Sequence, residues 1–253
     1  MSSKPVVFSF VSLFLYCAAG AQTILSFRAD DGLEVVADKY FVSDTLPWIL
    51  MFHQAGSSRG EFREIAPKLC RLGYNGLAVD LRHGKEINFV SNETAVKAKA
   101  DNYPRSMADA MTDMEAAVGW VTGRSDKPAV LFGSSFSASL ALILAMDNPA
   151  AHAVIAFSPG EFFGHPDLVQ NAVSNLEIPV FLASTNKEYP YVKELCSGIA
   201  NEYKTLFSPA ETDGTHGARA LWESEESSRE YWLGLLMFFK RIRELQSKNN
   251  TER

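Results

Sequence analysis

The stretch AVLFGSSFSASLALILA, residues 129–145, is the most informative part of this chain. A short apolar run typical of a buried strand leads into Gly133, then into four serines within six residues, and then into a helix-like apolar pattern. Small hydroxyl residues are thus crowded where a strand passes into a helix. Either they let two elements pack closely, or one of them is a nucleophile on a tight turn.

Apolar, strand-like runs alternate with helix-like segments on both sides of this stretch. Strands are predicted at 23–29 and 34–42, joined as a hairpin across Asp31-Gly32, and at 48–53, 76–80, 129–133, 153–158 and 179–184. Helices are predicted at 61–74, 106–123, up to Met146, and from near Ser227 onward. Continuous apolar strands separated by single helices are typical of a mostly parallel sheet covered on both faces. We therefore predict an α/β fold with one domain over 22–253.

The N-terminus is typical of an exported protein. Lys4 precedes an uncharged apolar segment, residues 5–21, that ends in the small residues Ala19-Gly20-Ala21. This pattern predicts a signal peptide, residues 1–21, cleaved before Gln22, and therefore a secreted or periplasmic protein. The segment is slightly shorter than a spanning helix, so an uncleaved N-terminal anchor is the alternative.

Composition excludes several classes of function. The formal net charge is −6 and no basic stripe runs along the chain, which argues against nucleic acid or an anionic membrane as a partner. The sequence has no CxxC, no HExxH and no His/Cys cluster, so neither a metal site nor a cofactor is predicted. Export would permit a disulfide between Cys70 and Cys196, but the sequence leaves their pairing open.

The serine turn, Gly133-Ser134-Ser135-Phe136-Ser137, matches the pattern G-x-S-x-G except that Ser137 replaces the last glycine. In such a strand–turn–helix motif the central serine adopts a positive φ, so the residues two positions away on either side must be small. Gly133 and Ser137 meet this requirement. Ser135 is therefore the predicted nucleophile.

A serine nucleophile needs a histidine as general base and a carboxylate that orients it. His216 is the one histidine beyond the last predicted strand, in a glycine-flanked loop. For the carboxylate, Glu188 follows the strand at 179–184 and is preferred, with Asp213 as the competing candidate.

With these residues the chain resembles the α/β-hydrolase superfamily, and in particular small single-domain serine hydrolases related to dienelactone hydrolases and serine aminopeptidase-like esterases. The segments MFHQAGSSRGEFREIAPKLCRLGYNGLAVDLRHG (51–84) and PVFLASTNKEYP (179–190) carry the likeness. The resemblance implies an oxyanion hole formed by the N–H of Phe136 together with that of Gln54 or Ala55, and it gives His53 a structural role. Gln54 stands where the family has a glycine, and Ser135 stands where dienelactone hydrolases use cysteine.

The predicted function is hydrolysis of a small-molecule carboxylic ester, or of an amide, through an acyl-enzyme on Ser135. Only a short connection separates the strands at 153–158 and 179–184, which predicts that there is no large lid domain. The polar loop 82–105 is the candidate roof of the site, with Arg82, Phe89 and Tyr103. The substitutions at Ser137 and Gln54 motivate the alternative, a catalytically silent relative that binds a small ligand or a partner.

Overall fold

A computed structural model describes residues 22–251; the predicted signal peptide, residues 1–21, lies outside the described residues. The strands are β1 (Gln22–Arg28), β2 (Glu34–Tyr40), β3 (Trp48–Phe52), β4 (Asn75–Val79), β5 (Ala129–Ser134), β6 (Ala151–Phe157), β7 (Val180–Ala183) and β8 (Lys204–Phe207). The α-helices are α1 (Ile65–Arg71), α2 (Glu93–Ala100), α3 (Ala110–Thr122), α4 (Phe136–Met146), α5 (Leu168–Ala172), α6 (Tyr189–Leu195) and α7 (Ser228–Thr251). Two short 3-10 helices are η1 (Arg59–Phe62) and η2 (Ala218–Leu221).

The strands form one sheet of eight, in the order β1-β2-β4-β3-β5-β6-β7-β8. Strands β3 to β8 are mutually parallel, whereas β1 and β2 form the predicted antiparallel hairpin and β2 also pairs antiparallel with β4. Because β3 to β8 run parallel, the carboxyl ends of these strands and the loops after them share one edge of the sheet.

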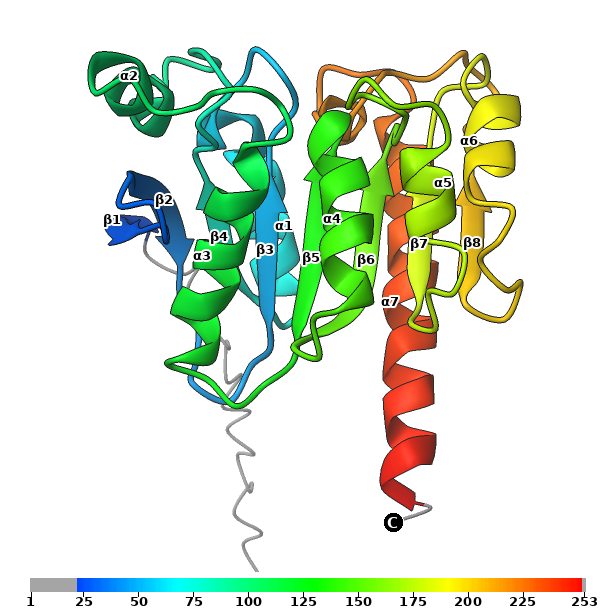
Figure 1. Cartoon of the computed structure of the whole chain (residues 1–253). Coiled ribbons are helices and arrows are strands. Elements are labelled where there is room, and N and C mark those ends of the chain that lie inside the picture. Colours follow the sequence, from blue (N-terminus) through cyan, green and yellow to red (C-terminus); the bar gives the residue numbers. More distant parts are fainter. Residues whose placement is uncertain (1–21, 252–253) are drawn as a thin grey trace, which may run out of the picture.

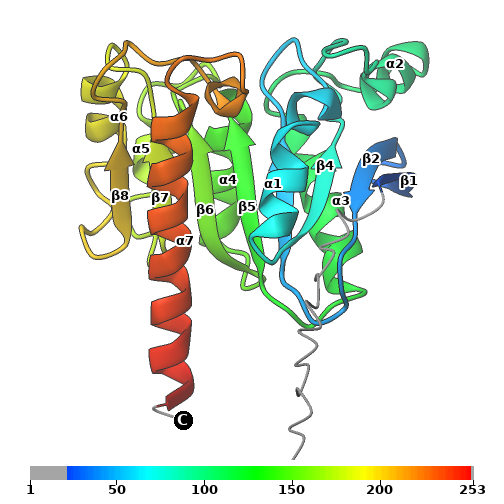
Figure 2. The same cartoon turned by 180° about the vertical axis from the view of Figure 1, so that it is seen from behind.

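Helices cover both faces of this sheet, as predicted. Helices α3, α4 and α5 pack on the face seen in Figure 1, and α1 and α7 pack on the opposite face, seen in Figure 2. The strand WILMF explains why both faces are covered. Leu50 and Phe52 are buried in one core cluster, and Ile49 and Met51 are buried in the other. An apolar residue at every position therefore suits a strand with no solvent-exposed face.

Several elements differ from the prediction, among them the short helices α5 and α6, which were not expected. The helix expected at 61–74 is divided into η1 and α1, because the ring of Pro67 does not allow an α-helical turn through the carbonyl of Arg63. The stretch 82–105, expected to be a polar loop, contains α2, whose first turn is capped by the side-chain oxygen of Asn92. The edge strand β8 was missed because only Leu206 and Phe207 are apolar in it.

The two cysteines of the described residues, Cys70 and Cys196, are buried and free, so they form no disulfide. Over the described range, no helix has the combination of length and apolarity that crossing a bilayer requires.

Candidate active site

The serine turn occupies the carboxyl edge of the central strand β5. Ser135 lies between β5 and α4 and has φ 60° and ψ −122°, which is the strained backbone predicted for it. A Cβ atom on Gly133 would lie 2.3 Å from the carbonyl oxygen of Ser137, so glycine is required there. The strain presents the hydroxyl of Ser135 at the start of α4.

Ser137, the residue in place of the expected glycine, has its own bonding role. Its hydroxyl donates to the carbonyl oxygen of Phe52 at 2.7 Å and accepts the N–H of Ser134 at 2.9 Å. The side chain therefore ties the turn to the end of β3. This substitution stabilises the turn by hydrogen bonds that a glycine cannot make.

His216 lies in the segment between β8 and η2, which crosses the top edge of the sheet in orange in Figure 1. Its Nε2 atom is 2.9 Å from the hydroxyl oxygen of Ser135. The next residue, Gly217, has φ 74°, and a Cβ there would lie 2.4 Å from Oε1 of Gln54. Glycine thus lets this loop approach the turn closely, and the side chain of His216 remains 45% exposed.

Glu188 completes a chain of three polar side chains. Its Oε1 atom is 2.5 Å from Nδ1 of His216, and its Oε2 atom accepts the hydroxyl of Ser158 at 2.7 Å and the N–H of Thr185 at 3.1 Å. Burial opposes ionisation of this carboxyl, but the hydrogen bonds from His216, Ser158 and Thr185 outweigh it and lower the pKa of Glu188 to about 2. Glu188 is therefore an anion at neutral pH.

Asp213, the competing carboxylate, is placed elsewhere. It forms an exposed ion pair with Lys187 at 3.2 Å. Of the two carboxylates that the sequence left open, Glu188 is the one that contacts His216.

Ser158 was not assigned a role from the sequence. It follows β6 with φ 53° and is buried. Its hydroxyl donates to Glu188 and accepts the N–H of Gly217 at 3.1 Å. One side chain therefore connects the carboxylate to the loop that carries the histidine. A positive φ at a serine does not alter the periodicity of the sequence, so no motif indicates the role of Ser158.

Glu61 is a second residue that the sequence analysis missed. Its side chain is fully buried, and its carboxyl accepts the hydroxyl of Ser134 at 2.7 Å and the N–H of Gln54 at 3.0 Å. The hydroxyl of Ser134 in turn accepts the N–H of Ala218 at 2.8 Å. Burial raises the pKa of Glu61 above its usual range. Glu61 links the end of β3, the serine turn and the histidine loop.

The predicted oxyanion donors differ in whether their N–H groups are already hydrogen-bonded. The N–H of Gln54 is engaged by Glu61, whereas those of Ala55 and Phe136 have no acceptor within the described part of the chain. Phe136 is the first residue of α4, so its N–H has no partner inside the helix and points from the helix N-terminus.

A polar recess adjoins the turn. It has a volume of about 520 Å³ and is bounded by Gly56, by the segment after β4 and by α2. The ring of His83 on its wall contacts the ring of Phe136, with centroids 5.7 Å apart. The cations Lys85, Lys99 and Arg105 line it, and none of them has an ion-pair partner in the part of the chain that the structure describes.

Two of the residues expected to roof the site do not do so. The side chain of Arg82 is buried and bonds Asp113 at 2.8 Å and Asp31 at 2.6 Å, so it braces α3 and the hairpin instead. Phe89 is 97% exposed at the tip of a turn.

The described residues contain no cluster of three or more metal-binding side chains.

His53 is structural, as expected from the sequence. It is fully buried, and its Nδ1 lies 2.8 Å from the carbonyl oxygen of Gln54. Its Nε2 lies 2.9 Å from the N–H nitrogen of Leu81 and 3.1 Å from the side-chain amide of Asn92. Because the lone pair of Nε2 accepts these hydrogen bonds, it is not available to bind a proton. Burial lowers the pKa of His53 to about 4.

This environment predicts a pH-dependent stability. His53 binds a proton in the unfolded chain at about pH 6.5 and in the folded chain only at about pH 4, so its contribution is complete above pH 6.5 and is lost as the pH falls. Between pH 7 and pH 5 we expect the free energy of unfolding of the parent to fall by about 2 kcal/mol more than that of His53→Gln. Urea unfolding of both proteins at the two pH values measures this; equal slopes would contradict it.

A model of the dienelactone hydrolase family matches residues 35–209, more than half of the chain. The chain belongs to the dienelactone hydrolase family. The residues matched to this family include Ser135 and Glu188, and His216 lies beyond them. The resemblance predicted from the motifs is thereby confirmed, and membership supports hydrolase activity on esters.

Solved structures confirm the α/β-hydrolase fold of this dienelactone hydrolase family member. An esterase of Pyrococcus furiosus has a TM-score of 0.64 at 18% identity, covering 88% of this chain and 91% of its own. A dienelactone hydrolase of Anabaena variabilis has a TM-score of 0.61 at 18% identity, covering 86% and 95%. At these identities the likeness shows the fold alone. A comparison with curated proteins gives no match.

Proposed function

We propose that this family member is a serine hydrolase that cleaves carboxylic esters, or amides, through an acyl-enzyme on Ser135. The observation that carries the proposal is the continuous contact from Ser135 through His216 to Glu188. A hydroxyl, an imidazole and an ionised carboxylate in this order and at these distances form the arrangement that activates a serine for acyl transfer.

Each step follows from the named atoms. The hydroxyl oxygen of Ser135 attacks the ester carbonyl while its proton moves to Nε2 of His216, and Glu188 stabilises the imidazolium. The oxyanion of the tetrahedral intermediate accepts the N–H groups of Phe136 and Ala55. Such preorganised donors stabilise the transition state by roughly 3–4 kcal/mol each.

The intermediate then collapses and the leaving alcohol takes the proton from His216, which leaves Ser135 acylated. Water attacks the acyl-enzyme and gives its proton to Nε2 of His216. Release of the carboxylic acid returns that proton to the oxygen of Ser135 and restores the starting state.

Ser158 is a positioning residue in this mechanism, because it holds the carboxylate that orients the histidine. A hydrogen bond to a charged group contributes about 1.5–3 kcal/mol, so we expect Ser158→Ala to lower kcat/KM by about 10- to 100-fold. Its loss also removes a donor from Glu188 and raises the pKa of that carboxyl, so the additional loss of activity that protonation of Glu188 causes in acid should begin at a higher pH than in the parent. Ser139→Ala, which removes a hydroxyl bonded to Gly160 instead, is the control and should leave both unchanged. An unaltered pH profile in Ser158→Ala would contradict the positioning role.

The recess beside Phe136 indicates a preference for substrates whose acyl group carries an anion, since Lys85, Lys99 and Arg105 outnumber the one carboxylate in its lining, Glu86. None of these three cations has an ion-pair partner among the described residues. We expect the p-nitrophenyl monoester of glutaric acid to be hydrolysed with about tenfold higher kcat/KM than the neutral p-nitrophenyl valerate. The double variant Lys99→Gln/Arg105→Gln should lose this preference while keeping its rate on the valerate ester. If the parent and the double variant preferred the charged ester to the same degree, the recess would not determine substrate preference.

We also propose that the protein acts after export, in the periplasm or outside the cell, as the residues 1–21 predict. A small-molecule ester is its proposed partner. No cofactor enters the proposed mechanism.

The alternative is a silent relative that binds a ligand or a partner without turnover. Pre-steady-state hydrolysis of p-nitrophenyl acetate by the purified protein separates the two. An acyl-enzyme mechanism predicts a burst of p-nitrophenolate that approaches one equivalent of enzyme, followed by a slower steady rate. The absence of both phases in folded protein would favour the silent relative.

A further inference from the structure

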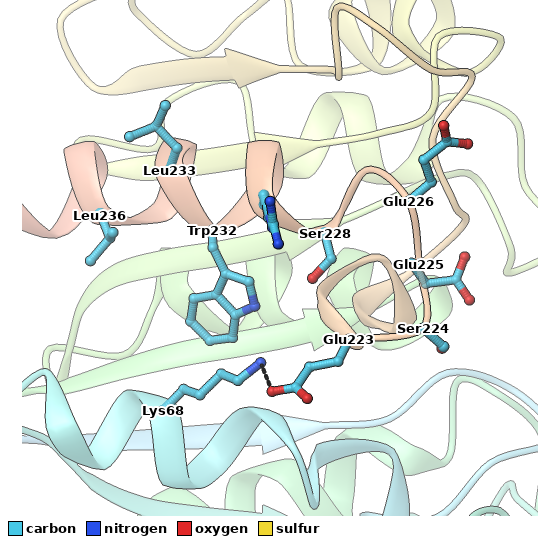
Figure 3. A pocket seen from close by; sticks show the side chains of 10 residues that line it. Lys68, Glu223, Ser224, Glu225, Glu226, Ser228, Trp232, Leu233 and Leu236 are labelled. Atoms are coloured by element: carbon cyan, nitrogen blue, oxygen red, sulfur yellow. Dashed lines mark ion pairs between the residues drawn. The ribbon is translucent and has the colours of Figure 1, made fainter.

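A groove lies on the face of the sheet opposite α4, between α1 and the first half of α7 (Figures 2 and 3). Its volume is about 920 Å³. Trp232 and Lys68 face each other across it: the amine of Lys68 lies 5.4 Å from the centre of the indole and 3.0 Å from a carboxylate oxygen of Glu223. The proposed mechanism uses no residue of this groove.

The side of α7 that borders the groove is apolar and uncovered. Leu233 is 60% exposed, Leu236 is 41% exposed and Met237 is 67% exposed. Their spacing of three and four residues places them on one side of the helix. The opposite side of α7 is buried in the core through Leu235 and Phe238, among others. A contiguous apolar patch of this kind marks an interaction surface.

Charge is distributed unevenly about this patch. Glu223, Glu225 and Glu226 gather at the end of the groove where α7 begins, as Figure 3 shows. Lys240 and Arg243 are exposed on the far side of the patch, where Lys240 forms an exposed ion pair with Glu244 at 3.8 Å. Neither Glu226 nor Arg243 has an ion-pair partner among the residues that the structure describes.

We propose that two copies of this chain associate through α7, antiparallel about a two-fold axis, so that the Leu233–Met237 side of each helix enters the groove of the other. An antiparallel arrangement places the basic half of one helix beside the acidic loop of its partner, and the two-fold axis makes each contact occur twice. The two apolar patches then meet at the centre.

A second copy of the chain fits this surface because the charge pattern, turned end to end, is complementary to itself. The exposed side of α7 runs for about 21 Å from Arg229 to Arg243. The acidic loop with Glu223, Glu225 and Glu226 precedes the apolar patch, and Lys240 and Arg243 follow it. A parallel arrangement would bring acid against acid and base against base, which opposes association. Arg229 also lines the acidic end of the groove, together with Glu225 and Glu226.

Sedimentation equilibrium of the purified protein over a concentration series tests this proposal. We expect a mass that approaches two chains, and at least a 100-fold higher dissociation constant for Met237→Glu, which puts a charge at the centre of the interface. Ile24→Glu alters a residue of similar exposure, 63%, on β1 and should leave the dissociation constant unchanged. A parent protein that stays monomeric at every concentration would overturn the proposal, as would dimerisation that Met237→Glu leaves intact.

A charge exchange tests the antiparallel arrangement separately. Glu226→Lys and Arg243→Glu should each weaken association by about tenfold, and the double variant should restore it because the charges are again opposite across the axis. Double-variant association weaker than that of both single variants would contradict this arrangement. Ester hydrolysis is expected to be unchanged in all of these variants, so the outcome is independent of the proposed function. Circular dichroism confirms that each variant is folded.

Discussion

Ser135→Ala is expected to lower kcat/KM for p-nitrophenyl acetate by about 10⁵- to 10⁶-fold, since the nucleophile of a serine triad has effects of this size. The variant loses the atom that forms the acyl-enzyme, and neither His216 nor Glu188 can replace it. The substitution should leave the fold intact, because the side-chain partner of this hydroxyl is His216 alone among the described residues. Steady-state hydrolysis and the burst phase both measure the loss.

Ser139→Ala is the matched control, because Ser139 lies in the same serine-rich stretch but its hydroxyl donates to the carbonyl oxygen of Gly160. Its activity should stay within a few-fold of the parent. Hydrolysis that persists at more than about one part in a thousand in Ser135→Ala would mean that another residue carries the acyl group.

Glu188→Gln is expected to lower kcat/KM by about 10⁴-fold, the size seen when a triad carboxylate becomes an amide. The donors Ser158 and Thr185 both face Oε2 of Glu188, so they hold the amide oxygen of the glutamine in that position. The amide NH₂ then faces Nδ1 of His216. Nδ1 must accept this hydrogen, the ring proton moves to Nε2, and Nε2 can no longer take the proton of Ser135.

Two further variants make this prediction specific. Glu188→Asp keeps the charge but shortens the side chain, so its loss should be smaller than that of the glutamine variant. Asp213→Asn removes only an exposed ion pair with Lys187 and should leave the rate unchanged. If Asp213→Asn were the inactive variant instead, the assignment of the carboxylate would be wrong.

The sequence was sufficient for seven of the eight strands and for the three polar residues because these have strong local patterns. A strand buried on both faces must be apolar at each position, as in residues 48–52, and a nucleophile turn must be small on both sides of Ser135. Chain order then left His216 as the candidate base.

Other features depend on tertiary contacts and leave weak patterns. Ser158 and Glu61 act through hydrogen bonds to residues distant in the chain, so neither has a motif. Arg82 was expected to face a substrate, but its charge is satisfied by Asp113, which is 31 positions away. The N–H groups of Gln54 and Ala55 differ through the carboxyl of Glu61, which accepts the N–H of Gln54 and has no sequence motif of its own.

We propose that Ser135 is an activated nucleophile. The most direct measurement is treatment of the purified protein with a fluorophosphonate probe, followed by mass spectrometry of the intact chain and of its peptides. We predict a single adduct on the peptide that contains Ser135, formed in the parent and absent from Ser135→Ala. Folded protein that stays unlabelled, or that is labelled on another residue, would contradict this account of the site.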